Sequence, residues 1–420
     1  MLPEVISERI TFDAMCEQLL QGTGPIAIDA ERASGYKYSQ RAYLIQIFRR
    51  GGGLHLIDPI AVNDATAWSG LSELLKEEEW IIHASTQALP CLRELGLEPQ
   101  LLFDTELGAR IAGLPRVGLG ALCESLLGLA LAKEHSAVDW STRPLPENWL
   151  IYAALDVDVL VDLRDAVAEL LVDAGKLEWA QEDFAAILNN PPVAPRVDPW
   201  RRTSGMHKVR DRMTLGIIRA LWSARDEYAR EIDISPGRIF NDEILLELAT
   251  KRPATVDEFT KIVKRRTRVT ELPTTQWFET LRKTLALSLE ELPEIRTPSQ
   301  TLPPIKVWRE RNPSAYARIT HARAAVATKA AELNIPTENL LSPEVLRQLM
   351  WKNPHLSPDT PMNERINYLK VALEELGARS WQSAAVVEVL TEPLLATTPL
   401  VVESPSEVLS EDGTEANAEN

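Results

Sequence analysis

Apolar residues in the first 190 positions alternate between short continuous runs and longer stretches with helical spacing. Short runs of branched residues are typical of buried strands, whereas apolar residues three and four positions apart are typical of amphipathic helices. Strands are predicted at 26–28, 43–47, 54–57 and 80–82. Helices are predicted at 67–75, 89–95, 107–111, 119–127 and 149–172. This alternation predicts an α/β domain over residues 1–188.

Prolines change the pattern after this domain. Closely spaced prolines in 189–206 predict an extended linker, because proline interrupts a helix and restricts the preceding residue to extended backbone. From residue 207 the spacing is helical, and an offset of 101 superimposes six positions of one segment on another. Ile234, Phe240, Glu243, Leu245, Leu248 and Pro253 fall on Ile335, Leu341, Glu344, Leu346, Leu349 and Pro354. The repeat predicts two all-α bundles, at 207–292 and 293–395.

The formal charge of -16 argues against a protein that coats nucleic acid indiscriminately. Six of the acidic residues and no basic ones lie between Glu403 and Asn420, so residues 396–420 are predicted to form a disordered acidic tail. Three cysteines without a CxxC pair favour a reducing compartment. With no signal-peptide pattern and no membrane-length apolar run, we expect a cytoplasmic monomer without membrane contact.

Two pairs of residues carry the candidate chemistry. Asp29 and Glu31 follow an apolar strand and are two residues apart, so both carboxylates project from one face. Tyr152 and Asp156 are four apart in a helical pattern and also share a face. Carboxylates gathered from separate elements suit hard divalent ions, and two such ions can activate water and stabilise the oxygens of a phosphodiester. The pattern therefore indicates phosphodiester hydrolysis, with Tyr152 positioning or deprotonating the water.

Three motifs give these residues a family context. The first combines 26–31 with 43–47, the second spans 81–92, and the third joins 139–145 to 152–156. Together they resemble the DEDDy subclass of the DEDD 3′–5′ exonucleases, and most closely the ribonuclease D family. The resemblance implies a ribonuclease H-like exonuclease domain, in which a mixed sheet is flanked by helices. It also implies that the bundles are HRDC domains, a nucleic-acid-binding module, and that the second bundle is divergent.

The resemblance assigns roles to the site residues. Asp29 would bridge two divalent ions, Mg²⁺ or Mn²⁺, while Glu31 and Asp156 would complete the first ion's site and Tyr152 would align the water. The family has an aspartate five residues after His83, where this chain has Ala88. Loss of this ligand predicts an impaired enzyme that still binds substrate. Because the other site residues are intact, the pattern favours a single engineered aspartate-to-alanine change over a drifting pseudoenzyme.

The resemblance also implies the substrate. It predicts a 3′–5′ exoribonuclease that trims structured RNA such as tRNA precursors and releases 5′-mononucleotides. A non-catalytic RNA 3′-end-binding or scaffold protein is the alternative, and a DNA exonuclease remains open because nothing in the sequence reads a 2′-hydroxyl. Candidate nucleic-acid contacts are Ala30, Gln46, His83, Lys264, Arg265, Arg266 and Arg268, the last four from the densest basic cluster.

Overall fold

The computed structural model describes residues 3–131, 138–190, 196–296, 302–352 and 354–400. The chain divides into two compact units, Met1–Pro298 and Ser299–Asn420. Most of the predicted acidic tail, residues 401–420, lies outside the described residues. No helix in the described ranges has the length and apolar character to cross a membrane.

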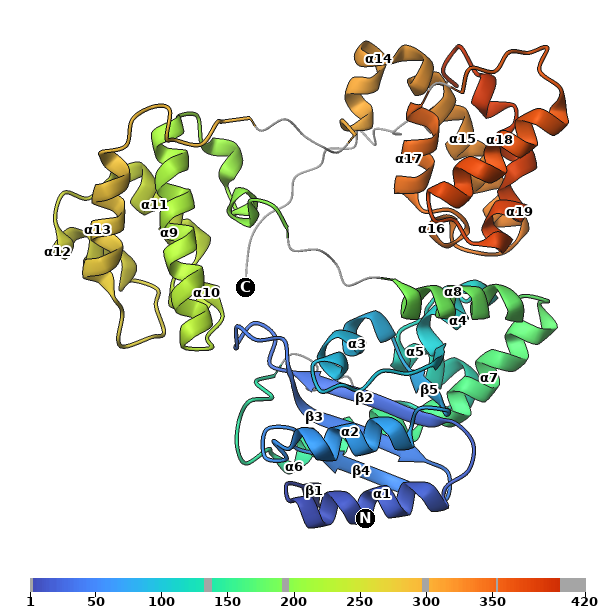
Figure 1. Cartoon of the computed structure of the whole chain (residues 1–420), viewed down its shortest axis with the longest axis horizontal. Helices are drawn as coiled ribbons and strands as arrows, with labels where there is room; N and C mark the ends of the chain where they lie inside the picture. Colours follow the sequence, from blue (N-terminus) through green and yellow to red (C-terminus); the bar gives the residue numbers. More distant parts are fainter. Residues whose placement is uncertain (1–2, 132–137, 191–195, 297–301, 353, 401–420) are drawn as a thin grey trace, which may run out of the picture. The chain divides into compact units, whose positions relative to one another are not determined.

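A six-stranded mixed sheet forms the centre of the first unit (Figure 1). Its strand order is β1-β4-β3-β2-β5-β6, with β2 antiparallel to β3 and parallel to β5. The strands are β1 (Val5–Ile6), β2 (Ile26–Arg32), β3 (Ala42–Arg49), β4 (Gly53–Ile57), β5 (Glu79–Ile82) and β6 (Leu101–Asp104). All six consecutive residues from Ala42 to Ile47 are buried, so both faces of β3 lie in the core, as its continuous apolar run predicts.

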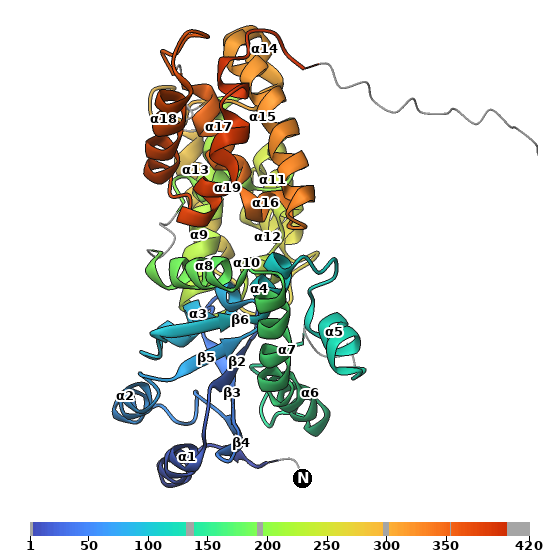
Figure 2. The ribbon, with the colours of Figure 1, turned by 90° about the vertical axis from the view of Figure 1, so that its right-hand side faces the viewer.

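Helices cover both faces of this sheet. Figure 2 shows α1 (Arg9–Gln21) and α2 (Ala65–Leu74) on one side, and α6 (Glu147–Asp158) and α7 (Leu160–Asp173) on the other. The mixed sheet with flanking helices confirms the predicted fold class. The remaining helices of this domain are α3 (Ser85–Arg93), α4 (Thr105–Ala112), α5 (Leu119–Leu122), the π-helical turn η1 (Cys123–Leu127) and α8 (Leu177–Asn189).

The predicted strands and helices differ from the observed ones mainly at their ends. The predicted helix 149–172 is two helices, because α6 ends at Asp158 and α7 begins at Leu160. The two-residue β1, β6 and helices α1 and α8 have no counterpart among the predicted elements. Asp104 caps α4 by accepting hydrogen bonds from the backbone N–H groups of Glu106 and Leu107, as its position before a helix indicates.

A helical bundle follows within the first unit. Two short 3₁₀ turns, η2 (Pro199–Arg202) and η3 (Met206–Lys208), lead into it. The bundle comprises α9 (Arg212–Glu231), α10 (Pro236–Ile239), α11 (Asp242–Lys251), α12 (Val256–Val263) and α13 (Thr274–Leu285). Phe240, Phe259 and Leu281 are fully buried in its core. The bundle therefore has a hydrophobic core of its own.

The second unit repeats the start of this bundle. It contains η4 (Ile305–Val307), α14 (Trp308–Arg311), α15 (Pro313–Glu332), α16 (Thr337–Leu340), α17 (Pro343–Trp351), α18 (Met362–Glu375), α19 (Ser380–Leu390) and η5 (Pro393–Leu395). Helices α15 and α16 begin and end 101 residues after α9 and α10, and α17 begins 101 residues after α11. The repeat seen in the sequence thus extends to secondary structure.

Candidate active site

A cavity of about 430 Å³ opens where β2, α3 and α6 meet. Its wall brings together the predicted pairs Asp29 with Glu31 and Tyr152 with Asp156, and it also includes Ala88. The other lining residues are Ala30, Arg32, Ser34, His83, Ala84, Gln87, Leu119 and Val138. Three segments separated by more than fifty residues in sequence therefore converge on one pocket.

Strand β2 and helix α6 place the four candidate catalytic side chains in this pocket. Asp29 and Glu31 project from one face of β2, and α6 packs across β2 and β3 with Tyr152 and Asp156 one turn apart. The carboxylate of Asp29 accepts a hydrogen bond of 2.8 Å from the backbone N–H of Ala30. Ala153 and Ala154 are buried, so the small side chains next to Tyr152 let α6 lie close to the sheet.

The three carboxylates perturb one another. Burial raises the pKa of Asp156 to about 7, and the charge of Asp29 adds to the effect. Burial, followed by the charges of Asp29 and Asp156, raises the pKa of Glu31. Burial likewise raises the pKa of Asp29, although the Ala30 N–H and Arg32 oppose it. Ionisation of all three carboxyl groups is therefore disfavoured in the metal-free pocket.

The carboxylates fit a divalent cation. In the described ranges no three His, Cys, Asp or Glu side chains already stand in ligand geometry. Asp29, Glu31 and Asp156 nevertheless share one pocket and disfavour one another's ionisation, and a hard cation would relieve this. The donor set supplies three carboxylates for one ion. For a second ion, Ala88 contributes only a methyl group where a carboxylate is expected.

Ala88 lies on the pocket wall within α3. It is 4% exposed, and its carbonyl accepts a hydrogen bond from the Cys91 thiol. The start of α3 is fixed by Asp104, whose carboxylate accepts hydrogen bonds from the N–H groups of Ala84 and Ser85. The backbone at position 88 is thus held in place independently of its side chain.

Tyr152 remains protonated in this environment. Burial and the negative charge of Asp156 raise the pKa of the phenol far above its ordinary value, and Tyr152 is hydrogen-bonded to the Asp156 carboxylate. A protonated phenol positions a water molecule through hydrogen bonds but does not remove its proton. Of the two roles predicted from sequence, the metal-free structure favours positioning.

The metal-free protein is expected to lose stability as the pH rises from 5 to 8. Unfolded carboxyl groups titrate near pH 4, whereas the pKa of Asp156 in the folded protein is about 7. The folded state therefore binds more protons in this interval, and the stabilisation present below pH 4 is lost as the pH rises through 7. Allowing for screening by solvent, we expect a loss of about 1 kcal/mol, or about 2–4 °C in Tm.

Calorimetry in EDTA at both pH values measures this loss. The difference between the chain and its Asp156→Asn variant isolates the contribution of Asp156, because the variant lacks that carboxyl group. Added Mn²⁺ should restore stability at pH 8. A destabilisation that is the same in both proteins would contradict the assignment.

The predicted nucleic-acid contacts of the nuclease domain separate into two groups. Ala30 and His83 line the pocket. The Nδ1 of His83 lies 2.9 Å from the Thr105 hydroxyl, and burial lowers the pKa of the ring, so the imidazole is neutral at pH 7. Gln46 lies opposite Asp29 on β3 but is fully buried and outside the pocket lining. Within the part of the chain that the structure describes, its side-chain amide has no hydrogen-bond partner, and nucleotide contact by Gln46 stays a prediction.

The basic cluster after α12 is partly neutralised. Arg265 forms an ion pair with Glu247, and Arg266 forms one with Glu243. Lys264 and Arg268 are exposed. Their backbone N–H groups donate hydrogen bonds, but neither side chain makes a hydrogen bond or ion pair with any residue that the structure describes. Lys264 and Arg268 are therefore the stronger candidates for phosphate contacts.

Arg32 was not among the residues predicted from sequence. Among the lining residues that the structure describes, it is the one Lys or Arg, and its charge opposes the rise in pKa of Asp29 and Glu31. The β2–β3 register shifts between Glu31 and Arg32, and such a bulge can redirect a side chain. A cation directly after the Asp29–Glu31 pair was a visible signal, but strand alternation alone placed it on the opposite face.

Comparison with known proteins agrees with this geometry. Residues 3–171 match the model of a 3′-5′ exonuclease domain, and residues 214–280 match the HRDC domain. Residues 301–394 match a 3′ to 5′ exonuclease C-terminal domain. These three domains define the class of the protein as an exonuclease-fold chain with accessory helical domains.

Curated relatives identify the family. Ribonuclease D of Escherichia coli is 30% identical over 264 residues, which cover 61% of this chain and 68% of that protein. The chain belongs to the ribonuclease D family. Ribonuclease D of Gluconacetobacter diazotrophicus is 33% identical over 248 residues, and the matched region spans 56% of this chain and 60% of the relative.

Solved structures extend the match over most of the chain. A protein from Bifidobacterium adolescentis is 37% identical, with a TM-score of 0.84 and coverage of 94% of this chain and 97% of that one. Escherichia coli RNase D has a TM-score of 0.63 at 23% identity, covering 94% of this chain and 99% of that one, and supports the fold.

Proposed function

We propose that this chain carries the site of a metal-dependent 3′–5′ exoribonuclease and that Ala88 impairs its catalysis. The observation that carries the proposal is the shared pocket of Asp29, Glu31, Tyr152 and Asp156, assembled from β2 and α6. Family membership supports RNA as the substrate. The related Escherichia coli enzyme is described as an exoribonuclease involved in structured RNA processing. By analogy, the proposed substrates here are structured RNAs such as tRNA precursors.

The roles of the residues follow from their chemistry. Asp29, Glu31 and Asp156 would hold a divalent ion, Mg²⁺ or Mn²⁺, and Asp29 would also face a second ion. Bound there, the ions supply a water of lowered pKa and neutralise charge on the phosphate oxygens. Tyr152 orients the attacking water, and Arg32 offers a guanidinium to the phosphate. With Ala88 in place of a carboxylate, Asp29 is the single protein ligand in the pocket assigned to the second ion.

The direction and products of cleavage test this proposal. The full chain and its Ala88→Asp variant are incubated with Mn²⁺ and RNAs labelled at either end, one set blocked by a 3′-phosphate. The proposal predicts stepwise shortening from a free 3′-hydroxyl and release of nucleoside 5′-monophosphates. Internal cleavage, or shortening from the 5′ end, would contradict it.

Ala88 also favours a second function, that of a non-catalytic protein that binds RNA 3′ ends. In this reading the nuclease pocket serves as a clamp for the terminal nucleotide. The two functions separate in the same assay. If both proteins bind RNA but neither shortens it, the binding function replaces the enzymatic one.

Phosphate contacts by the helical bundle give a separate prediction. Replacing Lys264 or Arg268 with glutamine should weaken RNA binding and reduce the slope of log K against log salt by about 1, since each loses one phosphate contact. Arg266→Gln is the matched control, because Arg266 is paired with Glu243. Fluorescence anisotropy over a range of salt concentrations measures the slopes. Equal effects of all three changes would show that the unpaired side chains have no special role.

A further inference from the structure

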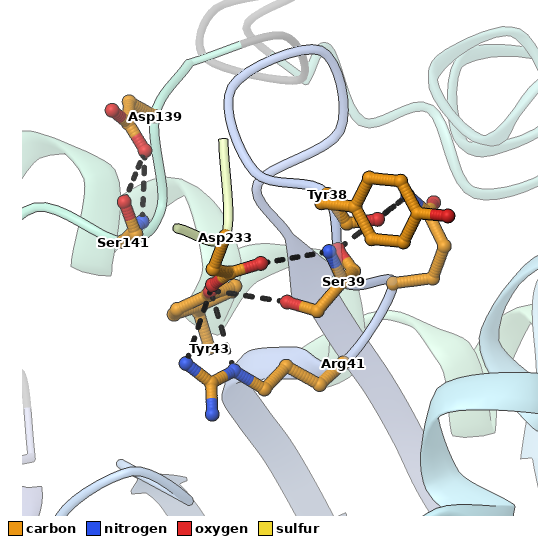
Figure 3. Close-up of polar contacts among 8 residues, drawn as sticks. Tyr38, Ser39, Arg41, Tyr43, Asp139, Ser141 and Asp233 are labelled. Carbon is orange, nitrogen blue, oxygen red and sulfur yellow. Dashed lines mark hydrogen bonds and ion pairs between the residues drawn. The ribbon is translucent and has the colours of Figure 1, made fainter. Parts of the chain in front are cut away.

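One carboxylate of the helical bundle, that of Asp233, contacts three residues of the nuclease domain. Asp233 follows α9, and its Oδ1 accepts a 2.8 Å hydrogen bond from the backbone N–H of Ser39. Its Oδ2 accepts a 3.2 Å hydrogen bond from the Tyr43 hydroxyl and lies 3.5 Å from Nη2 of Arg41. Figure 3 shows these groups converging on Asp233. We call this set of four residues, which lies within the first unit, the Asp233 clasp.

The loop that carries the clasp, residues 33–41, makes further contacts with the bundle. The hydroxyl of Tyr38 donates a hydrogen bond of 3.1 Å to Asp226 of α9. The guanidinium of Arg238 in α10 lies 3.8 Å from the ring centre of Tyr36 and donates a 2.7 Å hydrogen bond to the carbonyl of Gly35. The bundle therefore holds the loop at several points along its length.

One end of this loop lines the active-site pocket, and β3, which follows its other end, packs against α6. The loop begins directly after β2, and Arg32 and Ser34 line the catalytic pocket. At the other end, the buried Tyr43 belongs to the core cluster that includes Ala153 and Ala154, the residues after Tyr152 on α6. Tyr43 is also the residue skipped in the β2–β3 register, where Glu31 pairs with Leu44 and Arg32 with Ala42. A displacement of the clasp would therefore be transmitted to the pocket wall and to α6.

Comparison of Asp233 with the equivalent residue of the second bundle, Asn334, shows which of its properties the backbone requires. Asp233 has a left-handed backbone with φ of 49°, and Asn334, 101 residues later, has φ of 47°. Asparagine and aspartate both tolerate this conformation, so the backbone alone does not require a carboxylate. In the first bundle the carboxylate faces three groups that favour its ionised form, two hydrogen-bond donors and Arg41.

We infer that Asp233 is a positioning residue for cleavage, which orients the loop 33–41 and Tyr43 so that Arg32 and α6 keep their places around the substrate phosphate. The inference rests on the proposed function. It makes the bundle a part of the catalytic apparatus in addition to a surface for RNA. RNA that shifts the bundle would alter the pocket through this clasp.

Asp233→Asn tests the inference, because asparagine keeps the backbone conformation and removes the charge. In the full chain carrying Ala88→Asp, we expect kcat on a five-nucleotide RNA to fall about tenfold, since small misplacements of reacting groups reduce rates strongly. KM should change less than twofold, because the short RNA gains little from the bundle. Asp257→Asn is the matched control: Asp257 is exposed in the same bundle and should leave kcat unchanged.

Amide hydrogen exchange gives a readout that does not depend on catalysis. Asp233→Asn should accelerate exchange in residues 33–43 and also in 147–158 of α6, whereas Asp257→Asn should accelerate neither. Faster exchange confined to 33–43, or in neither segment, overturns the inference, as does an unchanged kcat. If Ala88→Asp itself is inactive, the proposed function fails, and the exchange in 147–158 still decides whether the clasp positions α6.

Discussion

Replacing Ala88 with aspartate is expected to raise the rate of nucleotide release from RNA by about 100-fold or more. Ala88 lies on the wall of the pocket that contains Asp29, and α3 is fixed by Asp104, so a new carboxylate would enter the pocket without movement of the backbone. It would complete the ligands for a charge-stabilising ion, and loss of one such transition-state interaction commonly reduces rates by 10²–10³. Single-turnover release of 5′-mononucleotides in Mn²⁺ measures the gain.

A neighbouring substitution controls for charge. Gln87→Asp adds a carboxylate to the same pocket wall one residue away, where the geometry is wrong for the family motif. We expect it to leave the rate near that of the parent chain. An equal gain in both variants would show that added negative charge, not the ligand position, is responsible.

Removing the Tyr152 hydroxyl is expected to have the second largest effect. In the Ala88→Asp background, Tyr152→Phe should lower the rate by about 10²-fold, because misplacement of the attacking water can reduce a rate by this much. The phenyl ring keeps its packing, and the hydrogen bond to Asp156 is lost. The effect should lie in kcat, because the hydroxyl acts on water and not on RNA.

Anisotropy in Ca²⁺ checks that RNA binding is unchanged by this substitution. Tyr316→Phe on α15 provides the control, because it removes a hydroxyl outside the nuclease domain. A Tyr152→Phe variant with full activity would remove Tyr152 from the mechanism. A variant with weakened RNA binding would instead place the hydroxyl against the substrate.

The sequence was sufficient to predict the strands, helices and residue pairs that depend on a local pattern of apolar residues. Strand β3 and the pairing of Asp29 with Glu31 follow from apolar runs and strand alternation, and the 101-residue repeat follows from spacing. The two-residue β1 lacks any such signal, because its existence depends on pairing with β4. The break between α6 and α7 was missed because apolar spacing continues across Val159.

The sequence was less informative about side chains whose roles depend on distant contacts. Gln46 lies on a strand that the sequence predicts to be buried, and it could contact nucleotide or brace the sheet. In the structure its side chain is fully buried on β3, between β2 and β4. The cluster around Lys264 looked uniformly basic, but Glu243 and Glu247 approach it from α11. Asp233 carried no motif, since its importance arises only when Ser39 and Tyr43, some 190 residues earlier, fold against it.

Metal stoichiometry tests most directly the claim that this site lacks one ligand of a two-ion pair. Crystals of the chain and of its Ala88→Asp variant, soaked in Mn²⁺, would be compared by anomalous scattering. We predict one ion in the chain, held by Asp29, Glu31 and Asp156, and two ions in the variant. Two ions at full occupancy in the parent chain, or none in either protein, would contradict the account.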